Sequence, residues 1–135
     1  MDSKPRVSQP RFFPLAPRAL RRYADAGSAA RPVVPEGSFG WRLLGRNNWE
    51  LGRSTAAYPG DGWRAAARAV QELASELVVD VVPTDPQTWN WSASAGDRVL
   101  ATSARPFQRR RECSYNAERF VTALKEAIIP DEARP

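Results

Sequence analysis

The stretch FGWRLLGRNNWELGRSTAAY, residues 39–58, can be aligned with a second stretch of the same chain, TWNWSASAGDRVLATSARPF at residues 88–107. Repetition at a fixed period is typical of a duplicated supersecondary unit. The offset is 50 residues at the first aligned tryptophan and 49 at the aligned serine, so a length change falls in the turn between them, where loops tolerate it. Three pairs anchor the alignment: Trp41 with Trp91, Ser54 with Ser103, and Tyr58 with Phe107.

Within each copy, apolar residues first alternate and then change to helical spacing. Alternation with aromatic residues begins at Phe39 and at Trp89, which predicts half-buried strands. Turn-forming residues and a second strand follow in each copy, and then a short extended piece that leads to Tyr58 or Phe107. The predicted turns and second strands are 45–48 with 49–54, and 96–97 with 98–103.

A helix with one buried face follows in each copy, and each helix leads to a β-branched closing strand. Each unit is therefore predicted to contain three strands, a helix and a closing strand. The first buried stripe is Trp63, Ala67, Val70, Ala74 and Leu77, and the second is Cys113, Ala117, Phe120, Leu124 and Ala127. The closing strands are residues 78–82 before Pro83, and Ile128 with Ile129 before Pro130.

The segment DRVLATSARPF, residues 97–107, resembles the signature stretch of YegP-like proteins. In that stretch a turn leads to an aliphatic pair, a small residue, Thr-Ser and an aromatic residue. The similarity covers residues 38–129 and is weaker in the first copy, where Glu50 and Leu51 replace the aliphatic pair. Three further positions agree with the family pattern: Trp91, Ala117 and Phe120.

This resemblance implies an α+β fold: two tandem β3-α-β repeats form one antiparallel sheet with two helices packed on it. It also implies that the closing strands are exchanged between halves around a pseudo-twofold axis. The resemblance brings no reaction and no catalytic residues. The predicted organisation is a basic mobile N-terminal arm at 1–37, a first repeat at 38–82, a linker at 83–87, a second repeat at 88–130, and a tail at 131–135.

The arm is predicted to be mobile because it is rich in proline and arginine. Residues 1–37 hold six of the twelve prolines, and seven Lys or Arg against three acids. The rest of the chain is close to neutral, with 13 bases and 12 acids. Such a composition buries too little apolar surface to offset the entropy of ordering. Five apolar residues are the exception and are candidates to dock on the domain or on a partner: Phe12, Phe13, Leu15, Leu20 and Tyr23.

Catalytic chemistry is scarce in the sequence. Histidine is absent, and a single cysteine excludes a CxxC motif. No glycine-rich nucleotide loop occurs, so we expect no cofactor, no metal and no enzymatic activity. Glu50, Asp61 and Asp97 lie in or beside turns, where carboxylates are commonly solvated or capping. Cys113 follows three arginines, which favours a reactive thiolate, but its alignment with Trp63 predicts a core residue.

Basic and aromatic residues supply the candidate binding site. The candidate anion or nucleic-acid contacts are Arg105, Arg109, Arg110 and Arg111 in the fold, and Arg18, Arg21 and Arg22 in the arm. Trp41 and Trp91 sit at equivalent positions and are predicted to be core residues. Trp49 and Trp89 are less well matched and are better candidates for an exposed surface that stacks on bases.

We rank two functional hypotheses above an enzymatic function. The first is a non-catalytic interaction module that binds an unknown protein or small ligand, or pairs weakly with itself through a sheet edge. The alternative is a nucleic-acid binder that uses the arm and the Arg109–Arg111 run. No stretch approaches the ~20 apolar residues of a membrane span, which predicts a cytoplasmic protein without a membrane partner. The expected state is a monomer with internal pseudo-twofold symmetry or a weak homodimer.

Overall fold

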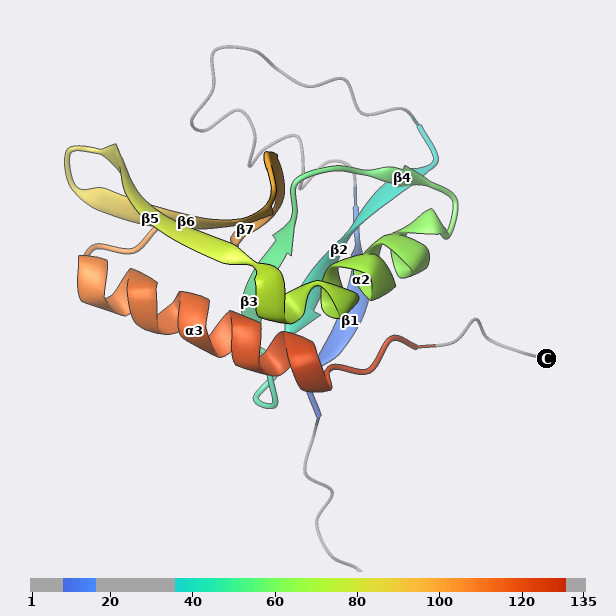
Figure 1. Cartoon of the computed structure of the whole chain (residues 1–135). Helices are drawn as coiled ribbons and strands as arrows, with labels where there is room; N and C mark the ends of the chain where they lie inside the picture. The colour runs from blue at the N-terminus through green and yellow to red at the C-terminus, as the bar shows by residue number, and fades with distance from the viewer. Residues whose placement is uncertain (1–8, 17–35, 131–135) are drawn as a thin grey trace, which may run out of the picture.

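The computed structural model describes residues 9–16 and 36–130. These residues form one antiparallel sheet with two helices packed on the same face, so the predicted α+β class is confirmed (Figure 1). No helix in this part of the chain is both long and apolar enough to cross a bilayer. The strands are β1 (Arg11–Leu15), β2 (Ser38–Leu44), β3 (Glu50–Ser54), β4 (Tyr58–Pro59), β5 (Val78–Asp85), β6 (Thr88–Ala95) and β7 (Arg98–Ser103).

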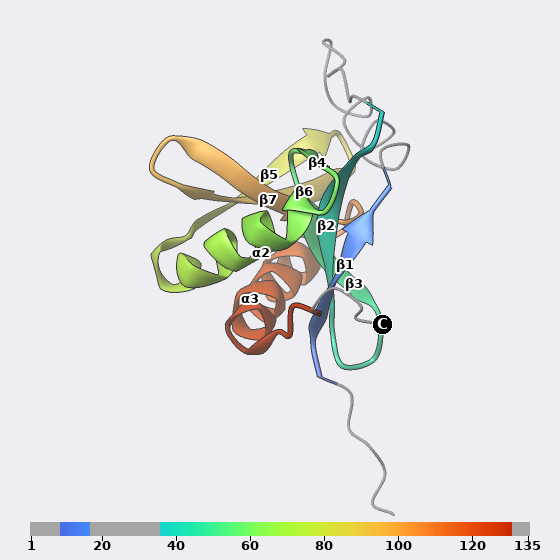
Figure 2. The ribbon, with the colours of Figure 1, turned by 90° about the vertical axis from the view of Figure 1, so that its right-hand side faces the viewer.

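The two helices, α2 (Gly62–Glu72) and α3 (Arg110–Glu126), lie next to each other on that face (Figure 2). The predicted buried stripe of α3 is confirmed, because all five of its residues are buried. The first stripe is interrupted: α2 ends at Glu72, and the short 3-10 helix η1 (Ala74–Glu76) carries the buried Ala74. Leu77, the last member of the stripe, is only partly buried.

The strand order is β1-β2-β3-β7-β6-β5, and β4 pairs with β2 outside this path. At the centre, β3 pairs with β7 through Arg53 opposite Thr102. β5 crosses from α2 to pair with β6, as predicted for the first closing strand. The second closing segment does reach the first half, but Ile128 bridges Arg11 of β1 rather than β2. β1 occupies the place beside β2.

This position of β1 corrects the prediction of a mobile arm for residues 11–15. Phe12 and Leu15 are buried, and β1 pairs with β2 along its whole length. The strand therefore belongs to the fold, which agrees with the prediction that these two apolar residues are candidates to dock on the domain. Leu20 and Tyr23 lie outside the described residues.

The predicted linker at 83–87 is also corrected. β5 continues through Pro83 to Asp85, and only Pro86 and Gln87 form the turn into β6. The Gln87 N–H donates to Asp85 Oδ1 at 2.8 Å, which closes this tight turn. Proline is tolerated in an edge strand where no ladder hydrogen bond is required.

The core is built around Phe120 of α3, which contacts both aligned tryptophans. Trp41 and Trp91 are each 1% exposed, so their predicted core role is confirmed. Their ring centroids lie 6.3 Å and 4.8 Å from that of Phe120. Gly52 makes room for this cluster, because a Cβ there would meet Phe120 at 2.7 Å and Trp91 at 2.8 Å.

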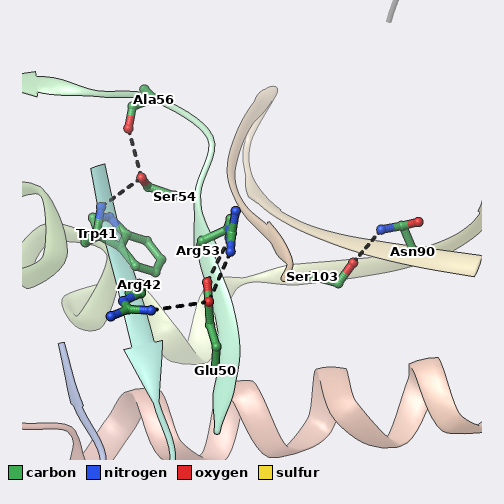
Figure 3. A network of polar contacts seen from close by, with 8 residues as sticks. All are labelled: Trp41, Arg42, Glu50, Arg53, Ser54, Ala56, Asn90 and Ser103. Atoms are coloured by element: carbon green, nitrogen blue, oxygen red, sulfur yellow. Dashed lines mark hydrogen bonds and ion pairs between the residues drawn. The ribbon is translucent and has the colours of Figure 1, made fainter. Parts of the chain in front are cut away.

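Equivalent positions in the two halves make matching contacts. The Trp41 N–H donates to Ser54 Oγ at 3.0 Å (Figure 3). The Trp91 N–H donates to Ser103 Oγ at 3.3 Å. Two aromatic pairs also match, since Phe39 pairs with Tyr58 of β4 and Trp89 forms an isolated bridge with Phe107.

Candidate functional site

The predicted basic site lies at the start of α3 and in the loop before it. Arg109 precedes the helix in an extended conformation, and Arg110 and Arg111 occupy its first turn. All three side chains are exposed, as is Arg105 in the loop. Glu112 is the acidic residue of this turn. The four candidate arginines of the fold therefore lie on one short exposed segment. Arg18, Arg21 and Arg22 lie outside the described residues.

Two of these arginines stand over aromatic rings. The Arg105 guanidinium lies 4.3 Å from the Phe107 ring centroid, and the Arg110 guanidinium lies 5.7 Å from that of Trp89. Trp89 and Phe107 are themselves joined by two backbone hydrogen bonds of 2.7 and 2.8 Å. These four side chains, Arg105, Phe107, Arg110 and Trp89, form the arginine–aromatic cluster. Such pairs contribute roughly 0.5 to 1 kcal/mol each at exposed sites.

The two candidate surface tryptophans differ from each other. Trp49, in the turn between β2 and β3, is 63% exposed. Trp89 is only partly buried: it packs against the core, and the Arg110 guanidinium lies 5.7 Å from its ring centroid. Exposure is therefore confirmed for Trp49, and Trp89 has a partly accessible ring.

Cys113 is a core residue, as its alignment with Trp63 predicts. Its side chain is 0% exposed, and burial raises the pKa of its thiol to about 11. A thiol with a raised pKa holds its proton at neutral pH and is a poor nucleophile. The three preceding arginines point into solvent and do not lower this pKa.

The three candidate carboxylates are held by arginines or exposed in turns. Glu50 accepts hydrogen bonds from Arg53 Nε at 2.8 Å and Nη2 at 3.0 Å, and Arg42 lies 3.8 Å away (Figure 3). Asp61, before α2, is exposed and lies 3.7 Å from Arg64. Asp97 is exposed in the turn between β6 and β7. Within residues 9–16 and 36–130, no cluster of three or more metal-ligating side chains occurs.

Strand register places a row of mostly polar residues across the sheet face that is remote from the helices. Each member pairs directly with the next, so their side chains share this face. The row contains two half-buried arginines that bracket Glu50 in the network of Figure 3. Its members, strand by strand from β1, are Phe13, Arg42, Arg53, Thr102, Ser92 and Asp80.

Sequence reasoning missed a groove between β5 and α3. The groove has a volume of about 570 Å³, and its apolar lining comes from Val79 and Val81 on the strand and from Ala117 and Val121 on the helix. Three polar side chains of α3 complete the lining: Ser114, Glu118 and Thr122. The sequence feature that could have indicated this groove is the β-branched run at 78–82, together with the stripe of α3 that lies next to its buried stripe.

The opposite face of β5 is also apolar in part. Val78 is 59% exposed and Val82 is 44% exposed, and the acidic Asp80 lies between them on this face. Val99 of β7, which shares their sheet face through Ser94, is 48% exposed. This strand therefore has exposed apolar side chains on one face, beside Asp80, and partly buried apolar side chains that line the groove on the other, beside Glu118.

Comparison of the chain with family models, with curated proteins and with solved structures finds no match.

Proposed function

We propose that this chain is a non-catalytic interaction module that binds a protein partner through the surface formed by β5 and α3. The observation that carries the proposal is that one edge strand has exposed apolar side chains on one face and an apolar groove along the other. Val78 and Val82 are about half exposed on one face, and Val79 and Val81 line the groove on the other. Exposed apolar surface around a strand edge is typical of protein-binding sites.

A capture experiment tests this function. The protein is immobilised and incubated with native lysate, and the retained proteins are compared with those captured by the double variant Val78→Lys/Val82→Lys. Trp49→Lys is the matched control, because it also replaces an exposed apolar residue but lies in the turn between β2 and β3. We expect the double variant to lose partners that the control retains. Identical capture by all three proteins would contradict the proposal.

A nucleic-acid-binding function is the second candidate, and the arginine–aromatic cluster favours it. A guanidinium beside a partly accessible indole, as for Arg110 and Trp89, offers a phosphate contact next to a stacking surface. Binding to a single-stranded oligothymidylate should weaken with salt by about 0.7 log units per log unit of salt for each phosphate contact. Replacing Arg105 and Arg110 by alanine should therefore reduce this slope by about 1.4.

The control for this second candidate is Arg119→Ala. Arg119 is exposed on α3 and lies 5.9 Å from the Tyr115 ring, so it is an arginine–aromatic pair outside the cluster. An unchanged slope in the Arg105/Arg110 variant, or an equal loss in the control, would remove the cluster as a nucleic-acid site.

We also propose that residues 38–130 are a tandem β3-α-β repeat of the YegP-like kind. What supports this is the pair of matching backbone-to-serine contacts at Trp41 and Trp91, together with the placement of Arg53 opposite Thr102. These two residues are themselves 49 positions apart, so the central strand pair is symmetric about them. A cytoplasmic location stays a prediction from composition.

A further inference from the structure

The outer side of β5 has backbone groups that no strand uses. In the part of the chain that the structure describes, only β6 pairs with β5. Trp89 of β6 exchanges both of its backbone hydrogen bonds with Phe107, so its N–H and C=O point away from β5. Opposite Trp89 lies Pro83, which has no N–H. Because bonded and non-bonded pairs alternate in an antiparallel ladder, the N–H and C=O groups of Val79 and Val81 point outward.

The opposite edge of the sheet is different, because its backbone has partners. The Phe12 N–H in β1 donates to the Ile128 carbonyl at 3.0 Å, and the Ile128 N–H donates to the Pro10 carbonyl at 2.9 Å. The segment after α3 therefore covers the edge at β1. The edge at β5 has no such cover among the described residues, and its free groups lie directly beside the groove.

A strand added to this edge would place its side chains in the groove. Residues that pair directly across two strands point to the same face, so residues opposite Val79 and Val81 would face α3. The groove floor is apolar, and its one charged lining residue is Glu118. Glu118 is exposed and has no ion pair within residues 9–16 and 36–130. The groove therefore suits apolar side chains at alternate positions with a basic side chain between them.

A second copy of this chain fits the edge poorly. A twofold pairing of β5 with itself that uses the outward groups of both Val79 and Val81 places Asp80 opposite Asp80. Like charges directly opposite each other in an antiparallel pair are destabilising. A basic segment instead meets two carboxylates, Asp80 on one face of the strand and Glu118 on the other.

We propose that β5 binds an extended protein segment as an additional strand, with apolar side chains at alternate positions on either side of a lysine or arginine. The apolar side chains lie over Val79, Val81 and Val121, and the basic side chain pairs with Glu118. This proposal rests on the proposed interaction function, and it names the class of partner that the same surface accepts.

The test uses the full-length ¹⁵N-labelled protein and the synthetic peptide TVTKTVT, whose symmetric pattern suits either strand direction. Titration to millimolar concentration should shift the amide signals of Val79 and Val81 and slow their hydrogen exchange. The peptide TVTETVT should bind about two- to five-fold more weakly, as expected for loss of one surface ion pair. Exchange that does not slow at Val79 and Val81, or shifts confined to another surface, would overturn the proposal.

Backbone pairing is tested by N-methylation of the peptide. In an antiparallel pairing, methyl groups on the second, fourth and sixth residues remove the N–H groups that face β5, and binding should be lost, whereas methyl groups on the third and fifth residues lie on the far side of the added strand and should leave binding largely intact. In a parallel pairing these two outcomes are exchanged. Equal binding of the two methylated peptides would exclude strand addition.

The charge assignment is tested by Glu118→Lys, a substitution at an exposed position that leaves the core unchanged. The preference should reverse, so that TVTETVT binds more tightly than TVTKTVT. An unchanged preference would show that Glu118 does not select the basic residue.

The experiments distinguish a failure of the strand-addition proposal from a failure of the proposed interaction function. If the Val78→Lys/Val82→Lys variant loses lysate partners but no peptide binds, the surface still binds proteins and only strand addition is wrong. If the variant retains every partner and no peptide binds, both proposals are wrong.

Discussion

Ser54 accepts a hydrogen bond from the backbone N–H of Trp41 at 3.0 Å, and its own hydroxyl donates to the Ala56 carbonyl at 2.8 Å. This one side chain thus joins β2 to the segment that follows β3. Ser103 has the corresponding role in the second half, where it accepts from the Trp91 N–H and from Asn90 Nδ2. Both serines are almost completely buried, so these bonds are shielded from water.

Replacing either serine should therefore destabilise the protein. Ser54→Ala leaves the Trp41 N–H without this acceptor, and Ser103→Ala does the same to Trp91. A buried donor without a partner costs about 1 to 3 kcal/mol. The free energy of unfolding from urea titration measures the effect. Ser92→Ala, at a half-buried position on the polar face, should stay within about 0.5 kcal/mol of wild type. Equal effects at all three serines would contradict the assigned role.

Gly52→Ala should destabilise the fold because its Cβ would lie 2.7 Å from Phe120. Overpacking of this kind costs roughly 1 to 3 kcal/mol. Phe120→Leu creates space at the same point, so the double variant should be more stable than the sum of the two single effects predicts. A double-mutant cycle by chemical denaturation measures this coupling. Simple additivity would indicate that the two residues do not share the constraint.

Cys113 should be unreactive, and its burial should make stability depend on pH in the alkaline range. Its pKa in the folded protein is raised to about 11 from 9.0, so the folded state holds the thiol proton more tightly than the unfolded state. The resulting stabilisation is full below about pH 9 and is lost as the pH rises toward about 11. The stability difference between wild type and Cys113→Ala should shrink across this range.

A second measurement on Cys113 uses thiol labelling of the native protein at neutral pH. Labelling should be slow in buffer and fast in denaturant. Rapid labelling of the folded protein would contradict a buried, protonated thiol.

Phe12→Ala should unfold or strongly destabilise the domain, because β1 supplies a fully buried ring. Phe12 lies 5.3 Å from Trp41, centroid to centroid, in an edge-to-face contact. Removing such a side chain costs about 3 to 5 kcal/mol. Phe13→Ala, on the other face of the same strand, should cost clearly less because Phe13 is only half-buried. Thermal unfolding of both variants measures the contrast, and equal melting temperatures would argue against β1 as part of the core.

The internal sequence similarity was sufficient to predict most of the sheet and both helices. It placed Trp41 and Trp91 in the core and assigned Cys113 to a buried stripe, because aligned positions of the two similar segments are expected to have equivalent environments. It could not place β1, since that strand lies outside the two similar segments, contains Pro14, and pairs with residues far along the chain. Local pattern carries no signal for such long-range pairing.

The candidate site was less predictable than the fold. The exposed arginines at 105 and 109–111 follow from their place around the start of a helix. Their aromatic partners depend on the isolated bridge between Trp89 and Phe107, which only the folded chain creates. The groove forms only because α3 packs beside β5. From the sequence alone, Glu118 is therefore indistinguishable from an ordinary solvated helix residue. Pro83 wrongly indicated the end of β5, because proline is tolerated at a non-bonded edge position.

Strand addition requires that the outer edge of β5 is free to pair. Amide hydrogen exchange of the unbound protein tests this directly, residue by residue. The N–H groups of Val78, Asp80 and Val82 should be protected by β6, and those of Val79 and Val81 should exchange much faster. Alternation of this kind along the strand is the predicted result. Protection of Val79 and Val81 equal to that of their neighbours would show that the edge is already occupied, and would contradict the strand-addition proposal.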